Sequence, residues 1–123
     1  MADVSVPAVL VATVVAFLLS GIYYGVLGTT GGRDLPGWVV PAVELPRNLV
    51  LSAVVGGLAA AATVESLGAS LLLGLALWVG FPLVLWGGAV AHEGTPVRDA
   101  ALHAGDWLVK LVAVSALVAA WPW

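Results

Sequence analysis

The sequence predicts an all-α integral membrane protein, a bundle of four transmembrane helices that forms a single domain over residues 1–123. Composition supports this fold class, because 62% of the residues are hydrophobic, only 9% are charged, and the mean hydropathy is +1.11. A soluble domain carries about 25% charged residues. The distribution of apolar residues supports it too, since stretches of about 20 residues, the length needed to cross a bilayer, recur along the chain.

The same composition excludes several classes of function. Four basic and seven acidic residues give a net charge of −3, which does not suit a soluble enzyme, a disordered chain or a nucleic-acid-binding protein with a basic face. The chain has no cysteine, so disulfide scaffolds, thiolate metal sites and thiol nucleophiles are excluded. No segment alternates with the period of two that a transmembrane β-barrel requires.

The first helix is expected over residues 6–27, which contain no charge. Pro7 suits its first turn, where the backbone N–H has no helical partner. A cleaved signal peptide is the alternative, but residues 1–5 lack a basic segment and no persuasive cleavage site follows. We therefore expect an uncleaved first span.

The next apolar stretch, residues 49–91, is about twice the length of one crossing. An acid, hydroxyls and a glycine interrupt it at residues 63–68, and these are residues that favour turns. This pattern predicts two helices, at about 48–64 and 68–91, joined by a tight hairpin. The last helix is expected at about 100–121.

Two prolines indicate where the second helix starts and where the third helix deviates from regular geometry. Pro46 fits the first turn of the second helix, and we expect residues 36–43, which precede it, to lie in the membrane interface. Pro82 lies inside the third helix, where it removes a backbone donor. We expect it to kink or locally open that helix.

Four spans place the loop at about 28–47 and the loop at about 92–99 on the same side of the membrane. Arg33, Arg47 and Arg98 all fall in these two loops. The positive-inside rule then predicts a multi-pass protein with both longer loops in the cytoplasm and both termini outside.

The candidate functional residues form a polar cluster: His103, Asp106, Lys110, Glu44 and Arg47. The first three are spaced i, i+3 and i+7, which places them in one stripe of the last helix. Charges inside a span normally face protein, water or each other, so the stripe indicates a proton- or ion-handling site in the bundle interior. The i, i+3 spacing of Glu44 and Arg47 equally fits a local ion pair at the entry to the second helix.

A structural interpretation of the stripe competes with the functional one. Trp107 and Trp121 could mark the two membrane interfaces of the last helix. His103 and Asp106 would then lie in the headgroup region, with the Lys110 side chain extending back toward it.

Small residues at spacings of four predict where helices approach closely. Gly21 and Gly25 form one such pair in the first helix, and Gly56 and Gly57 follow small residues by four positions in the second. We expect these four glycines to lie at helix contacts.

We predict no metal and no cofactor. His92 and Glu93 match the start of a zinc-protease motif, but the second histidine is missing. No phosphate-binding loop or nucleophile–base arrangement is present, so we expect no enzyme activity.

Three stretches carry a resemblance to a known family: residues 16–25, which include the paired aromatics Tyr23 and Tyr24, residues 77–82, and residues 93–121. Together they are similar to the bacterial family called domain of unknown function 1761. The resemblance implies four spans and a location in the cell membrane. It implies no activity and no catalytic residues.

Two hypotheses of function follow. The first is a small, oligomeric channel or transporter for ions, protons or small solutes, with the stripe facing a cavity or a symmetry axis. The second is a structural or accessory protein that packs against a larger membrane complex. The expected partners are the lipid bilayer and either further copies of the chain or another membrane protein, and not nucleic acid.

Overall fold

The computed structural model describes residues 4–28 and 36–120. These residues form four long helices and no strand, which confirms the predicted all-α fold, and all four helices are long and apolar enough to cross a membrane. The helical elements are α1 (Val6–Leu27), α2 (Val39–Ala61), a continuous run of α3 (Leu67–Trp78), the π-helical segment η1 (Val79–Leu83) and α4 (Val84–His92), and finally α5 (Val97–Ala119).

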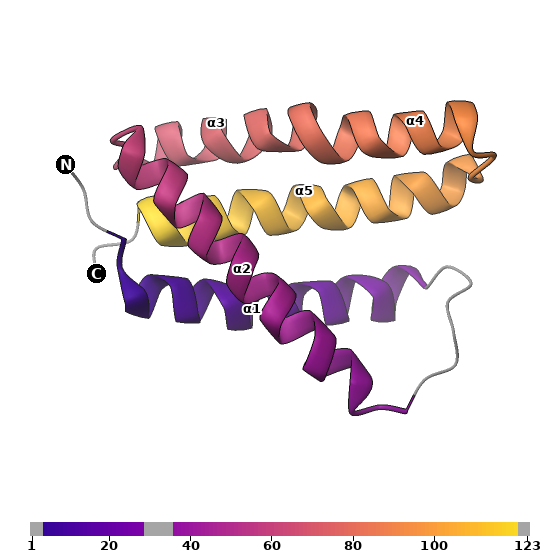
Figure 1. The fold of residues 1–123 in the computed structure, drawn as a ribbon, viewed down its shortest axis with the longest axis horizontal. Coiled ribbons are helices and arrows are strands. Elements are labelled where there is room, and N and C mark those ends of the chain that lie inside the picture. Colours follow the sequence, from indigo (N-terminus) through magenta and orange to yellow (C-terminus); the bar gives the residue numbers. More distant parts are fainter. Residues whose placement is uncertain (1–3, 29–35, 121–123) are drawn as a thin grey trace.

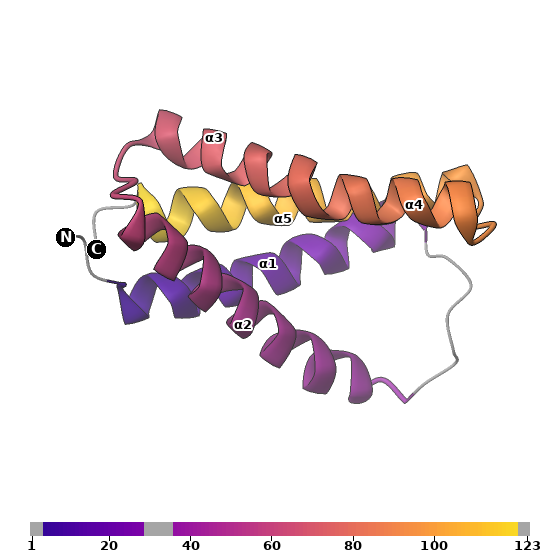
Figure 2. The ribbon, with the colours of Figure 1, turned by 45° about the horizontal axis from the view of Figure 1, so that its top comes forward.

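The helices pack around α5, which contacts every other element. In Figure 1, α1, α5 and the α3–α4 run lie nearly parallel, and α2 crosses obliquely over α1 and α5. The turn between α2 and α3 lies at the same end of the bundle as the start of α1 and the end of α5 (Figures 1 and 2). We call this the closed end, and the opposite end, where α1 ends and α5 begins, the cavity end.

Serine side chains fix the starts of two helices. The Ala8 backbone N–H donates to Ser5 Oγ (3.2 Å) at the start of α1, where Pro7 occupies the first turn. The Ala69 N–H donates to Ser66 Oγ (3.1 Å) at the start of α3. Each hydroxyl satisfies a backbone donor that has no partner within the helix.

The second helix begins at Val39, well before the expected start near residue 48. Pro41 occupies its first turn, where a missing N–H costs nothing, and Pro46 lies inside the helix rather than at its start. Neighbouring elements allow membrane helices to tolerate internal prolines. Residues 39–47, which we expected to precede the helix, therefore belong to α2.

The third span opens locally at Pro82, as the sequence predicts. Residues 79–83 adopt π-helical geometry between α3 and α4, and Pro82 is buried within this segment. A wider turn accommodates the proline ring and the missing N–H without ending the helix.

Polar residues lie inside the bundle and large apolar residues cover its outside. The buried polar residues are Thr13, Asn48, Ser52, Ser70, Asp106, Lys110 and Ser115. The outer side chains of the α3–α4 run, such as Leu72, Phe81 and Leu85, are each 68% exposed. This distribution suits a protein whose outer surface faces lipid.

The close helix contacts involve mostly different glycines from those predicted. Gly56 does pack closely, since a Cβ atom there would lie 3.4 Å from Val4, 3.6 Å from Val9 and 3.7 Å from Val118. A Cβ atom at Gly21, Gly25 or Gly57 would meet nothing within 4 Å in the described residues, so these three glycines make no close helix contact there. That they contact a helix of another copy of the chain stays a prediction.

The tightest approaches occur at two glycines that the spacing rule missed. A Cβ atom at Gly74 would lie 2.9 Å from the Leu111 carbonyl oxygen, so α3 and α5 meet backbone to backbone there. A Cβ atom at Gly105 would collide with the hydroxyl of Tyr23.

Candidate functional site

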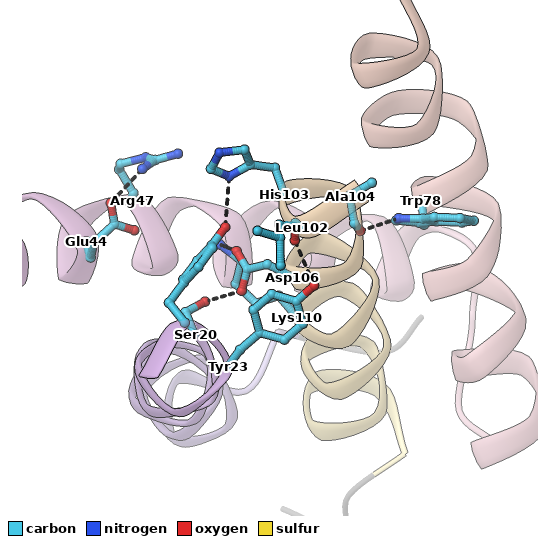
Figure 3. Close-up of polar contacts among 11 residues, drawn as sticks. Ser20, Tyr23, Glu44, Arg47, Trp78, Leu102, His103, Ala104, Asp106 and Lys110 are labelled. Carbon is cyan, nitrogen blue, oxygen red and sulfur yellow. Dashed lines mark hydrogen bonds and ion pairs between the residues drawn. The ribbon is translucent and has the colours of Figure 1, made fainter. Parts of the chain in front are cut away.

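A polar cavity of about 540 Å³ lies at the cavity end, between the second half of α1, the first half of α2, α4 and α5. All five residues of the predicted polar cluster line it: Glu44, Arg47, His103, Asp106 and Lys110. Ser20, Tyr24, Asn48 and Trp86 also contribute to the wall. Figure 3 shows the side chains of α1, α2 and α5 that converge here.

The centre of the site is a buried ion pair between Asp106 and Lys110. The Lys110 Nζ atom lies 3.2 Å from Asp106 Oδ2, and the two side chains are only 6% and 5% exposed. Ser20 on α1 donates to Asp106 Oδ1 (2.6 Å), as Figure 3 shows. The ammonium of Lys110 also lies over the Trp107 ring, 4.2 Å from its centroid. Both charges are thus satisfied within the protein.

Aromatic rings hold His103 at the cavity wall. Its ring stacks on Trp86 with a centroid distance of 4.6 Å and an interplanar angle of 13°. The Tyr24 hydroxyl and His103 Nδ1 are 2.9 Å apart and share a hydrogen bond whose direction depends on the histidine tautomer. His103 therefore links α1, α4 and α5 through one titratable ring.

Glu44 and Arg47 form a second ion pair, on α2. Arg47 Nη1 lies 2.6 Å from Glu44 Oε1, and their side chains are 57% and 27% exposed. The pairing is the local i, i+3 contact that the spacing allows, and the same two residues also line the cavity. Two carboxylates and two cations leave the cavity walls without net charge when His103 is neutral.

Two hydrogen-bond donors at the cavity have no partner among residues 4–28 and 36–120. The Asn48 side chain is buried, with 2% of the residue exposed, and its amide nitrogen makes no hydrogen bond. The indole nitrogen of Trp86 is also buried without a partner. Unpaired buried donors cost free energy, so a cavity lined by such groups favours a ligand or water that accepts hydrogen bonds.

The burial of the pair favours a site in the bundle interior over the interfacial interpretation of the stripe. α5 begins at Val97, so Asp106 and Lys110 lie on either side of its middle rather than near its end. Lys110 is buried beside Asp106, and Trp107 packs against the apolar core. Trp121 and Arg33 lie outside the described residues.

Several site residues could not be chosen from the stripe alone. Ser20, Tyr24 and Trp86 belong to apolar helices in which hydroxyls and indoles are common. Asn48 carried a usable signal, because it is the only asparagine in the chain and lies four residues after Glu44. Within residues 4–28 and 36–120, no three histidine, aspartate or glutamate side chains are grouped as a metal ion would need.

Fold and site together define a small, multi-pass membrane protein with a polar cavity inside a four-helix bundle. The chain belongs to the family described as "Protein of unknown function (DUF1761)", which matches residues 7–119, so the expected family is confirmed. Comparison with curated proteins and with solved structures found no match.

Proposed function

We propose that the protein moves protons or small polar solutes across the plasma membrane, and that it works as a carrier rather than as an open channel. The observation that supports this most is the buried Asp106–Lys110 pair in the wall of a cavity at one end of the bundle. Charged groups at this depth are costly unless they are used or paired.

The closed end supports a carrier over a channel. Between the helices on that side lies an apolar cluster formed by Ala12, Ala16, Val55, Leu111 and Val114, each at most 4% exposed. This cluster closes the bundle at that end, whereas the polar cavity lies at the other end, as in one state of an alternating-access cycle. The π-helical turn at Pro82, next to Trp86, supplies a deformable point in one wall.

The ion pair can keep the cavity neutral while a charged solute is bound. If an anion enters together with a proton, the anion pairs with Lys110 and the proton neutralises Asp106. His103 lines the cavity and shares a hydrogen bond with Tyr24, so its imidazole is a candidate to exchange that proton with solvent. This cycle makes and breaks no covalent bond other than those to protons, and no enzyme activity is assigned.

Proteoliposomes test this proposal. An imposed pH gradient, with valinomycin and potassium to balance charge, should drive proton uptake that an internal pH dye records. Asp106→Asn combined with Lys110→Gln removes the pair without leaving an isolated charge, and it should abolish the uptake. The matched control, Arg98→Gln combined with Asp99→Asn, removes an exposed pair (3.7 Å) on the same helix and should leave uptake intact.

Two results would overturn the proposal. One is a wild-type flux of protons, sodium, potassium and chloride that equals that of empty vesicles. The other is a flux that survives the loss of the Asp106–Lys110 pair.

We also propose that the cavity end faces the cytoplasm, because Arg98 lies beside the loop at that end and Arg47, about two turns inside α2, lies in the same half of the bundle. The chain has no cysteine, so Glu93→Cys and Glu65→Cys each introduce a unique, exposed label site at opposite ends. In intact cells a membrane-impermeant maleimide should label residue 65 and not residue 93. The reverse pattern would invert the orientation.

An accessory protein is the second candidate function. An apolar groove of about 760 Å³ between α2 and the α3–α4 run supports it, because a helix of another membrane protein could pack there. A stoichiometric partner that co-purifies with a chain inactive in flux would favour this role. A homo-oligomer would contain several cavities, one in each chain. Self-association is not needed to form the cavity, because each chain holds a complete one.

A further inference from the structure

The apolar groove runs along the side of the bundle where α2 diverges from the α3–α4 run. Its walls are aliphatic and aromatic, with Leu51, Val54 and Leu58 on α2 facing Leu77, Phe81 and Leu85 across it. Trp107 and Leu111 of α5 also line it. Arg47 is the single ionisable residue among its lining residues, and it lies at the start of the α2 wall.

The groove and the polar cavity adjoin each other. Arg47, Trp86 and Trp107 line both, so these three side chains form the boundary between the polar and the apolar compartments. A molecule that filled both would need a polar part beside Arg47 and an apolar part that extends toward Leu58.

The polar part must accept hydrogen bonds. The unpartnered groups near the boundary, the Asn48 amide nitrogen and the Trp86 indole nitrogen, are both donors. Arg47 donates a hydrogen bond from Nη1 to Glu44 Oε1. Its guanidinium carries further N–H donors that the ion pair does not use. A phosphate group matches this set, since it offers several acceptor oxygens and suits the planar donors of arginine.

We infer that the adjoining cavity and groove bind a glycerophospholipid, with the phosphate at Arg47, Asn48 and Trp86 and one acyl chain along the groove. The length agrees: Arg47 to Leu58 spans about 16 Å of helix axis at about 1.5 Å per residue. That length is close to the hydrocarbon thickness of one leaflet, which is half of the roughly 30 Å hydrocarbon layer. The charge at one end of the groove favours a lipid over the apolar helix of a second copy.

This site does not depend on the transport proposal. Lipid retention is measured on the purified chain without any flux, so either proposal can fail while the other holds. If both hold, the bound lipid and the transported species meet at Arg47.

Two variants on different elements test the site, because each removes one part of it. Arg47→Gln removes the phosphate partner at an exposed side chain. Gly80→Leu fills the groove, which Gly80 lines and where an added Cβ meets no atom within 4 Å. Gly87→Leu is the matched control, since Gly87 has equally open space but lines neither compartment.

The measurement is native mass spectrometry of the full chain, released from detergent micelles supplied with palmitoyl-oleoyl phosphatidylglycerol. The wild type and Gly87→Leu should each retain one lipid per chain. Arg47→Gln and Gly80→Leu should both retain it about tenfold less, the factor expected for the loss of one charge-assisted hydrogen bond or of the chain contact. Circular dichroism should show the same helix content for all four proteins.

Three results would overturn the inference. Retention that is equal in all four proteins would indicate lipid bound non-specifically around the bundle. A wild-type dimer that Gly80→Leu dissociates would place a second copy in the groove. A co-purifying protein that Gly80→Leu displaces would place a partner helix there.

Discussion

The two ends of the bundle are built from different side chains, although the same helices form both. At the closed end, α1 buries Ala8, Val9, Ala12, Thr13 and Ala16, and α2 packs on it through Val55, Gly56 and Ala59. At the cavity end, none of the described residues from 17 to 27 of α1 is buried, and the walls carry tyrosine, tryptophan and charged side chains.

This difference shows what sets the distance between the helices at each end. Helices in lipid gain little from apolar burial against each other, so close packing depends on small side chains that let backbones approach. Alanine, glycine and serine supply this at the closed end. At the cavity end, hydrogen bonds hold α1 to α5 instead: Tyr23 donates to the Leu102 carbonyl (2.8 Å), and Ser20 donates to Asp106 (2.6 Å). Small residues close one end, and polar contacts keep the other end assembled but hollow.

The sharpest test of this comparison is to isolate one charge of the buried pair. Asp106→Ala leaves Lys110 buried beside the Trp107 ring without its carboxylate partner, and Lys110→Ala leaves Asp106 with the hydrogen bond from Ser20. Removal of one partner of a buried pair costs about 3–5 kcal/mol, so we expect a loss of this size for Asp106→Ala and a smaller loss for Lys110→Ala. The free energy of unfolding from SDS titration in mixed micelles measures both.

The double variant Asp106→Ala with Lys110→Ala is the control for that experiment. It leaves no isolated charge, so it should be more stable than Asp106→Ala alone. Strictly additive losses would mean that the two side chains do not act as a pair, and the account of the cavity end would be wrong.

The second prediction concerns packing rather than charge. Gly74→Ala adds a methyl group 2.9 Å from the Leu111 carbonyl oxygen, and because that atom belongs to the backbone, α3 and α5 must separate. We expect a loss of about 2 kcal/mol in the free energy of unfolding, as for other overpacked contacts. Gly87→Ala, where the methyl group meets nothing within 4 Å, should not destabilise the protein. Equal effects would indicate that helix propensity, and not close approach, governs both glycines.

These packing contacts mark the limit of prediction from sequence. Hydropathy and length predict four spans because the bilayer imposes one length on every helix. The polar cluster was predictable because ionisable residues in a span are rare and their helical spacing fixes a shared face. Gly74 and Gly105 were not, since the group that each glycine meets depends on helix rotation, and the small-residue spacing selected Gly21 and Gly25 instead. The start of α2 was misplaced because Pro41 and Pro46 both fit a first turn, and sequence alone favoured the later one.

A smaller effect is expected at Gly105, where the obstacle is the end of a side chain. Gly105→Ala would push the Tyr23 hydroxyl away from the Leu102 carbonyl, and this should cost about 1 kcal/mol, the net value of one hydrogen bond. In a Tyr23→Phe background that hydrogen bond is already lost, so the added cost of Gly105→Ala should fall. SDS titration of the two single variants and the double variant measures this coupling. Independent effects would mean that Tyr23 does not fix the distance between α1 and α5.

The smallest effect should come from the second ion pair of the same cavity. Glu44→Gln removes a contact of 2.6 Å, shorter than the one between Asp106 and Lys110, yet it should cost only about 0.5 kcal/mol. The reason is exposure: the Arg47 side chain is 57% exposed, so its charge is not buried without a partner when Glu44→Gln removes the carboxylate charge. SDS titration of Glu44→Gln beside Asp106→Ala compares the two pairs directly. A loss at Glu44 as large as that at Asp106 would show that Arg47 is enclosed in the membrane-embedded protein, and burial would then no longer distinguish the two pairs.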